Sequence, residues 1–233
     1  MLFLLTLHII TQYFRRRHIE IDLKGIFNRF LVGLKYGIPF FLISFTKGEG
    51  ILSESESIRY EIVKKNKTLG YIHIKRVKNE EITRFVISSE VNTKLLLNFK
   101  AFSKETYIYN KDTLVFSSMY RTLNDKVKVD QSIIYEKGKY YLKNNSKNKL
   151  LDIGVIKCNL VKLFFDEPVD INQVYCDKLQ IHLSVVRMSV NTYKVVFPNR
   201  SYNVFHYENG KCRLIEVVGS LYKVRLVPKF QDL

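Results

Sequence analysis

SIRYEIVKKNKTLGYIHIK, residues 57–75, opens the stretch that decides the fold of this chain, and this stretch runs on to Leu142. Apolar and polar side chains alternate along it, so that Ile58, Tyr60 and Ile62 share one parity and charged residues take the other. A side-chain period of two places one set on a buried face and the other set in water. The stretch therefore predicts an antiparallel β-sheet with one apolar face.

The same alternation recurs in later runs of the stretch, and short polar turns separate these runs. The apolar side chains that it assigns to the buried face are Leu95, Leu97, Phe99 and Ala101, then Leu114, Phe116 and Tyr120, then Val127 and Val129. Among them, we expect Leu97, Phe99 and Phe116 to lie in the core.

The period changes after the polar loop at residues 144–149. Apolar residues then follow at helical spacings, with Asp152 as an N-cap and Pro168 beyond the end. These apolar residues are Ile153, Ile156, Leu160, Leu163 and Phe164. We expect one helix near residues 153–165 that lies across the open face or mouth of the sheet. Its apolar stripe is expected to pack in the core.

Alternation returns after Asp177, and Asn209-Gly210 is a strong hairpin signal because both residue types tolerate a positive φ. Several short strands with regularly spaced turns are typical of a barrel, a sandwich or one strongly curled sheet. The predicted fold class is all-β: a curled antiparallel sheet, barrel or sandwich, with one covering helix and a helical or hydrophobic N-terminal segment.

The N-terminal part, residues 1–52, differs from the rest. Met1–Phe14 is apolar and precedes Arg15-Arg16-Arg17, but as a helix it spans only about 21 Å, short of a bilayer core. Gly37–Phe45 follows charged residues and precedes polar ones, which is the order in a signal peptide. Two interpretations stay open: a targeting or membrane-associated element within residues 1–45, or a helical extension packed on the domain.

We divide the chain into residues 1–52, a hydrophobic targeting or membrane-associated segment with its linker, and residues 53–233, an antiparallel β domain. Ile38–Phe45 shows no period of two and contains Pro39, which cannot donate a ladder hydrogen bond. We therefore expect the segment before Ser53 to lie outside the folded sheet.

The formal net charge of +16 favours either a lysine-rich solvated surface or an anionic partner such as nucleic acid, an anionic membrane face or polyanionic glycans. Lysines interleaved with aromatic residues on a strand can contact a polyanion. Residues 139–143 are the best such patch, and Lys139, Tyr141 and Lys143 are the candidate contacts. Sequence-selective nucleic-acid binding is not expected, because the RNP motifs are absent.

No motif for catalysis, metal binding or a phosphate cofactor occurs in the chain. Cys158, Cys176 and Cys212 are odd in number and form no C-x-x-C; three free thiols are favoured over one bridge and a spare thiol. Asp166-Glu167 is an acidic pair whose members, being adjacent at the end of the predicted helix, are expected to point apart into solvent. We assign no catalytic, cofactor-binding or metal-binding residue, and we expect no enzyme.

Several strand motifs follow one another in a distinctive order. They are Ile58-Arg59-Tyr60, Thr68-Leu69-Gly70, Phe85–Val91, Lys94–Phe99 and Leu114–Ser118, followed by the acidic-Pro step at Leu163–Pro168 and a closing hairpin at Tyr207–Cys212. In this order the chain resembles a family of uncharacterised β-rich secreted proteins of Bacteroidetes. The resemblance covers about residues 57–227 and implies a signal peptide and an exported or cell-envelope address, but no activity.

The expected function is that of an exported or cell-envelope β-domain protein, periplasmic or secreted, acting as a non-enzymatic binding or structural module. Its partner would be an envelope component or an apolar ligand, and residues 1–45 could associate with a membrane. The alternative is non-specific nucleic-acid or polyanion binding through a face rich in lysine and tyrosine.

Overall fold

The computed structural model describes residues 53–93, 99–144, 147–220 and 222–229. The expectations for residues 1–52, for Leu95 and Leu97, and for the side chain of Phe99 lie outside what the structure describes. The first eight strands form a meander: β1 (Glu54–Lys64), β2 (Lys67–Lys78), β3 (Ile82–Thr93), β4 (Phe99–Asn110), β5 (Thr113–Leu123), β6 (Lys126–Glu136), β7 (Lys139–Asn144) and β8 (Lys147–Leu151). Six more follow after a connection: β9 (Gln173–Cys176), β10 (Ile181–Ser189), β11 (Thr192–Val196), β12 (Tyr202–Glu208), β13 (Lys211–Val218) and β14 (Lys223–Lys229).

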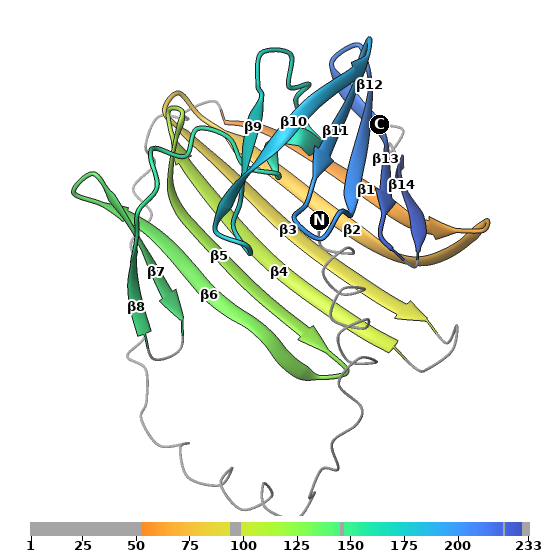
Figure 1. Ribbon diagram of the computed structural model, residues 1–233, viewed down its shortest axis with the longest axis horizontal. Coiled ribbons are helices and arrows are strands. Elements are labelled where there is room, and N and C mark those ends of the chain that lie inside the picture. Colours follow the sequence, from red (N-terminus) through yellow and green to blue (C-terminus); the bar gives the residue numbers. More distant parts are fainter. Residues whose placement is uncertain (1–52, 94–98, 145–146, 221, 230–233) are drawn as a thin grey trace, which may run out of the picture.

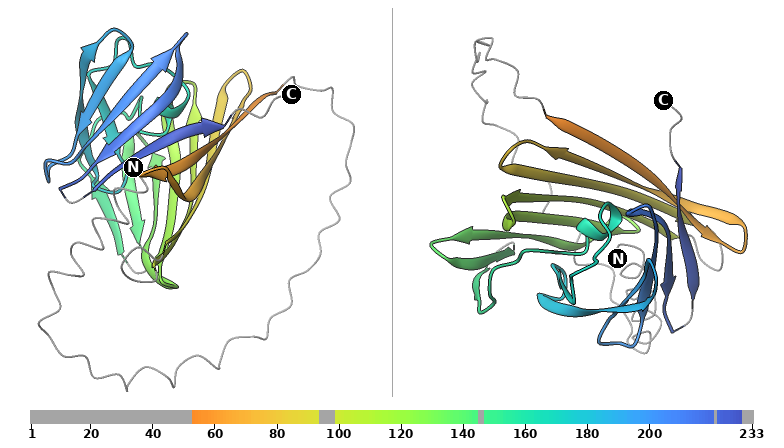
Figure 2. Two further views of the ribbon diagram at one scale, coloured as in Figure 1. Left: turned by 90° about the vertical axis from the view of Figure 1, so that its right-hand side faces the viewer. Right: turned by 90° about the horizontal axis from the view of Figure 1, so that it is seen from above.

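All fourteen strands belong to one antiparallel sheet in which β14 pairs with β1, so the two meanders are continuous. The sheet is open, and β8 and β9 form its two edges. It folds over at the β1–β14 junction, so that β9–β14 lie against one face of β1–β8 (Figures 1 and 2). The predicted all-β antiparallel class is confirmed, and the arrangement is two-layered rather than a closed barrel.

The face of β1–β8 that is turned toward the second layer, here called the inner face, carries the core. Ile58, Tyr60 and Ile62 of β1 are buried on it, as the alternation predicts. The connection between the layers fills the space between them: the Tyr60 hydroxyl of β1 donates to the Phe164 carbonyl oxygen at 3.0 Å, and the Tyr207 hydroxyl of β12 donates to that of Leu163 at 2.7 Å. Both layers therefore pack on residues 152–172.

The predicted covering helix near residues 153–165 is wrong. Only a single 3-10 turn, η1 (Lys162–Phe164), occurs there, and Asp152 caps no helix. The strands satisfy the backbone instead: the Leu114 amide donates to the Ile156 carbonyl oxygen, and the Ile156 amide donates to the Tyr140 hydroxyl. The expected core role of the stripe is confirmed, since Ile156, Leu160, Leu163 and Phe164 are all buried.

The parity predicted for β5 is wrong beyond Leu114. Tyr109 pairs with Leu114 and Ile108 with Phe116, which leaves Val115 as an extra residue, a β-bulge. A one-residue slip moves every later side chain to the opposite face. Leu114 is therefore buried, Phe116 is half-buried on the outer face, and Tyr120 is 39% exposed.

A second register shift, between β5 and β6, has the same kind of effect. It places Val127 opposite Thr122 on the outer face, where it is exposed, whereas Val129 stays opposite Arg121 on the inner face, as predicted, but is only half-buried. Ala101 is buried as predicted. The described residues include no helix with the length and apolar character that a membrane span requires.

Candidate functional site

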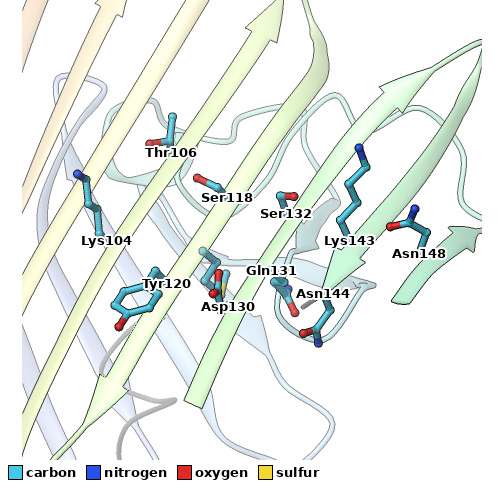
Figure 3. Close-up of a pocket in the computed structure, with 11 residues that line it drawn as sticks. Lys104, Thr106, Ser118, Tyr120, Asp130, Gln131, Ser132, Lys143, Asn144 and Asn148 are labelled. Carbon is cyan, nitrogen blue, oxygen red and sulfur yellow. The ribbon is translucent and has the colours of Figure 1, made fainter. Parts of the chain in front are cut away.

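A polar depression on the outer face of β4–β8, here called the outer depression, is the main candidate site. Its cavity volume is about 560 Å³, and Figure 3 shows the side chains that line it. Lysine, hydroxyl, amide and carboxyl groups dominate the lining: Lys104, Thr106, Ser118, Tyr120, Asp130, Gln131, Ser132, Lys143, Asn144 and Asn148, together with Met119. Its polar character distinguishes it from most small-molecule pockets, which are lined mainly by apolar groups.

One row of lining residues, here called the polar row, crosses five strands. Direct pairs link its members from β4 to β8: Thr106, Ser118, Ser132, Lys143 and Asn148. Figure 3 shows these side chains side by side on one face. Because neighbouring strands lie about 4.8 Å apart, the polar row extends over about 19 Å. It offers hydrogen-bonding groups at a regular interval, perpendicular to the strands.

A second row lies beside the first and carries charge. Lys104 of β4 pairs with Tyr120 of β5, which pairs with Asp130 of β6. Lys104, Asp130 and Lys143 are exposed, and within the described part of the chain none of the three forms an ion pair. The outer depression therefore holds two unpaired cations and one unpaired carboxylate around a partly exposed aromatic ring.

Of the three predicted polyanion contacts, the structure brings only one to this site. Lys139, Tyr141 and Lys143 share the outer face of β7, but only Lys143 lines the outer depression. Tyr141 is half-buried between its neighbours Ile134 and Leu150, and Lys139 lies exposed near the turn before β7.

Sequence reasoning missed Lys104, Tyr120 and Asp130, which belong to three different strands. Tyr120 was even assigned to the opposite face, because the bulge at Val115 is not visible in the sequence. No local sequence motif contains these three residues. They come together only because the register of β4, β5 and β6 places them opposite one another.

A second polar group lies on the inner face, between the layers. Glu105 and Arg121 are completely buried there, and Arg121 donates from Nη2 and Nε to Glu105 Oε1 at 2.5 Å and 2.9 Å. The Ser103 and Tyr107 hydroxyls also donate to this carboxylate, at 2.9 Å and 2.6 Å. Four hydrogen bonds to one buried carboxylate are typical of a stabilised ion pair, and removing one partner would leave a costly unpaired charge.

Asp177, which follows β9, lies in the same buried group and joins the two layers. Its Oδ1 accepts from the Ser117 hydroxyl of β5 at 2.9 Å, and its Oδ2 accepts from Asn159 Nδ2 at 3.1 Å. Its main-chain oxygen accepts from Gln131 Nε2 of β6 at 3.0 Å. Burial raises the pKa of Asp177 to about 7, although the hydrogen bonds from Ser117 and Asn159 act in the opposite direction.

The inner polar group acts structurally. Glu105 and Asp177 are both sealed from solvent, so a substrate has no access to either carboxylate. The enclosed space beside Glu105 measures about 10 Å³, too small for a ligand. The group therefore holds the second layer and the connection on the inner face.

The two acidic residues that follow η1, Asp166 and Glu167, contact different parts of the protein. Asp166 accepts from Arg76 Nη1 at 2.7 Å, and Glu167 accepts from the Tyr193 hydroxyl at 2.8 Å. The two side chains thus point apart, as predicted, but each contacts a side chain of the protein rather than solvent alone. Among the residues that the structure describes, no cluster of three or more histidine, cysteine or acidic side chains is suited to a metal ion.

Comparison with known families identifies the described domain. A family model, Domain of unknown function (DUF6134), matches residues 60–229. The chain belongs to this family. The match runs from β1 to the end of β14, so the DUF6134 domain comprises both layers and the outer depression.

No curated protein matches the sequence of this DUF6134 chain. Among solved structures, it is similar to a β-barrel-like protein of the domain of unknown function DUF1849 from Brucella abortus. The two are 14% identical, the TM-score is 0.45, and the similarity covers 74% of this chain and 94% of that one.

Proposed function

We propose that this DUF6134 protein is a non-enzymatic binding module of the cell envelope, and that the outer depression binds a polar envelope component. The observation that carries the proposal is the polar row, which presents hydroxyl, amide and ammonium groups from five adjacent strands. A polar lining matches a polar ligand, because each buried donor and acceptor requires a partner. An apolar ligand would leave these groups unpaired.

Binding without catalysis is supported by the chemistry of the lining. General acid–base catalysis requires acid and base groups that converge on one reacting atom, and their pKa values are usually shifted. Asp130 is the one carboxylate among the lining residues that the structure describes, and no histidine or cysteine accompanies it.

An envelope address is supported by two features of the sequence. Residues 37–45 have the order of a signal peptide, and the strand motifs resemble the secreted Bacteroidetes family. An exported module would meet polymers of the cell surface, which are rich in hydroxyl and charged groups.

The test is co-sedimentation of the full-length chain with envelope fragments of its own cells, alongside fractionation of the native protein. We expect the wild type to sediment with the fragments. Ser118→Arg, which places a long charged side chain in the middle of the polar row, should weaken retention at least about tenfold, equivalent to about 1.4 kcal/mol.

Ser57→Arg is the matched control, because Ser57 lies exposed on the outer face of β1, outside the outer depression. It should bind like the wild type. Equal retention of the two variants, or a native protein confined to the cytosol, would overturn the proposal.

Non-specific polyanion binding is the second candidate function, and the unpaired Lys104 and Lys143 favour it. Such binding depends on counterion release and should collapse between about 50 and 200 mM salt. Retention on envelope fragments that survives this range would exclude a purely electrostatic mode.

A further inference from the structure

We propose that the outer depression binds a linear acidic polysaccharide, a chain of β-linked uronic acid units that lies across the strands along the polar row. This inference rests on the proposed function and specifies its ligand. The spacing, the hydrogen-bonding chemistry and the charge of the lining residues carry it.

The spacing of the polar row matches an extended sugar chain. Thr106, Ser118, Ser132, Lys143 and Asn148 come from five consecutive strands, so their side chains repeat at the distance between strands, about 4.8 Å. This distance is close to the advance per unit of an extended β-linked pyranose chain. A sugar chain perpendicular to the strands therefore meets one polar side chain with each successive unit.

The chemistry of the lining suits sugar hydroxyls. The Ser118 and Ser132 hydroxyls each donate one hydrogen bond and accept others, and the Asn148 amide offers both a donor and an acceptor. Asp130, a carboxylate, accepts from hydroxyl groups. The ring of Tyr120, which lies in the outer depression between Lys104 and Asp130, offers an apolar face to the C–H groups of a pyranose.

The charge of the lining indicates that the sugar is acidic. Lys104 and Lys143 lie in the outer depression without an ion-pair partner among the described residues, and each unit of a uronic acid chain carries a carboxylate that pairs with an ammonium group. A charge-assisted hydrogen bond to each lysine would favour an acidic chain over its neutral counterpart.

A single-stranded nucleic acid fits the lining less well. Its bases would need several exposed aromatic rings and a uniformly basic groove. The described lining has one tyrosine, so successive bases would lack the row of aromatic rings on which they stack.

The experiment measures binding of short β-linked oligomannuronates to the full-length chain by isothermal titration calorimetry. The comparison ligands are the neutral β-linked oligomannosides of the same length and an oligothymidylate. We expect the oligomannuronate to bind at least about tenfold more tightly than either, since one charge-assisted hydrogen bond contributes at least that factor. Affinity should rise with chain length and level off at about five units, the number that the polar row accommodates.

Lys104→Gln and Lys143→Gln should each weaken oligomannuronate binding about tenfold and weaken binding of the neutral oligomer much less, because glutamine keeps a hydrogen-bond donor but loses the charge. Lys139→Gln is the matched control, because Lys139 shares the strand and the face of Lys143 but lies outside the outer depression. It should change the affinity less than about twofold. Because these lysines are exposed, the variants should unfold at the wild-type temperature.

Three outcomes would overturn the inference. The first is oligothymidylate binding more tightly than oligomannuronate. The second is an equal effect of the Lys139 and Lys143 variants, which would indicate diffuse charge attraction. The third is that oligomannuronate does not bind, although Ser118→Arg still weakens retention on envelope fragments. That result would show that the ligand belongs to another chemical class, and it would leave the proposed binding function intact. Loss of both kinds of binding would overturn the proposed function itself.

Discussion

At the scale of single residues, Asp177 joins the two layers through a buried, hydrogen-bonded carboxyl group. Its carboxylate is fully buried, and burial raises its pKa to about 7. Asn159, which donates to it, has a buried Oδ1 that finds no hydrogen-bond partner among the described residues. A half-turn of the Asn159 amide would present this oxygen to a protonated Asp177, so the site has an acceptor ready for the proton.

We expect this buried carboxyl group to make stability fall as the pH rises. Its folded pKa lies above its unfolded value of about 3.9, so between these pH values the folded chain keeps a proton that the unfolded chain has released. The associated stability is complete at acid pH and is lost as the pH rises toward 7.

Asp177→Asn isolates this effect. The free energy of unfolding of the wild type, relative to the variant, should fall by about 1.4 kcal/mol per pH unit between about pH 5 and 7, and level off above 7. Urea denaturation at several pH values measures the difference. A difference that does not change with pH would show that Asp177 stays ionised in the folded chain.

At the scale of elements, the backbone of β3 lies very close to Gly70 of β2. A Cβ atom there would lie 2.8 Å from the Val91 Cα and still closer to the Glu90 carbonyl oxygen, both of them backbone atoms. The register of β1 and β2 shifts at the same place, between Ile62 and Val63. Glycine is therefore required here by space, not by a positive φ.

Gly70→Ala should destabilise the domain by about 1–3 kcal/mol, as for other overpacked sites, because the backbone of β3 must move. The control is Gly154→Ala in the connection between the layers, where an added Cβ meets no atom within 4 Å. It should change stability by less than about 0.5 kcal/mol. Chemical denaturation compares the two; similar losses would mean that β3 adapts freely.

At the scale of the whole molecule, the core is drawn from both layers of the described domain. Its buried apolar residues extend from Ile58 of β1 to Leu226 of β14, two strands that are paired with each other. Because the first and the last strand pair with each other, the main-chain hydrogen bonds that join the two layers lie within residues 53–229.

We therefore expect residues 51–233, expressed alone, to fold as a soluble β protein that unfolds cooperatively. Circular dichroism and urea denaturation would measure this, with the full-length chain as reference. Aggregation of the fragment, while the full-length chain remains a soluble monomer, would show that residues 1–50 contribute to the core.

The sequence alone determined most strands of both meanders and their tight turns, although β8 begins within the segment that it predicts as a polar loop. Alternation along β1 placed Ile58, Tyr60 and Ile62 in the core, and Asn209-Gly210 forms the β12–β13 turn with φ of 52° and 73°, as its composition predicts. These features are local: they depend on side-chain period and on the backbone preferences of two residues.

Only the tertiary structure decided the rest. The apolar stripe after Asp152 forms no helix, because β5 and β7 supply hydrogen-bond partners to Ile156 that a helix would otherwise provide internally. One bulged residue, Val115, moves Tyr120 to the outer face. The outer depression exists only through the register of five strands, because its side chains meet across the sheet rather than along the chain.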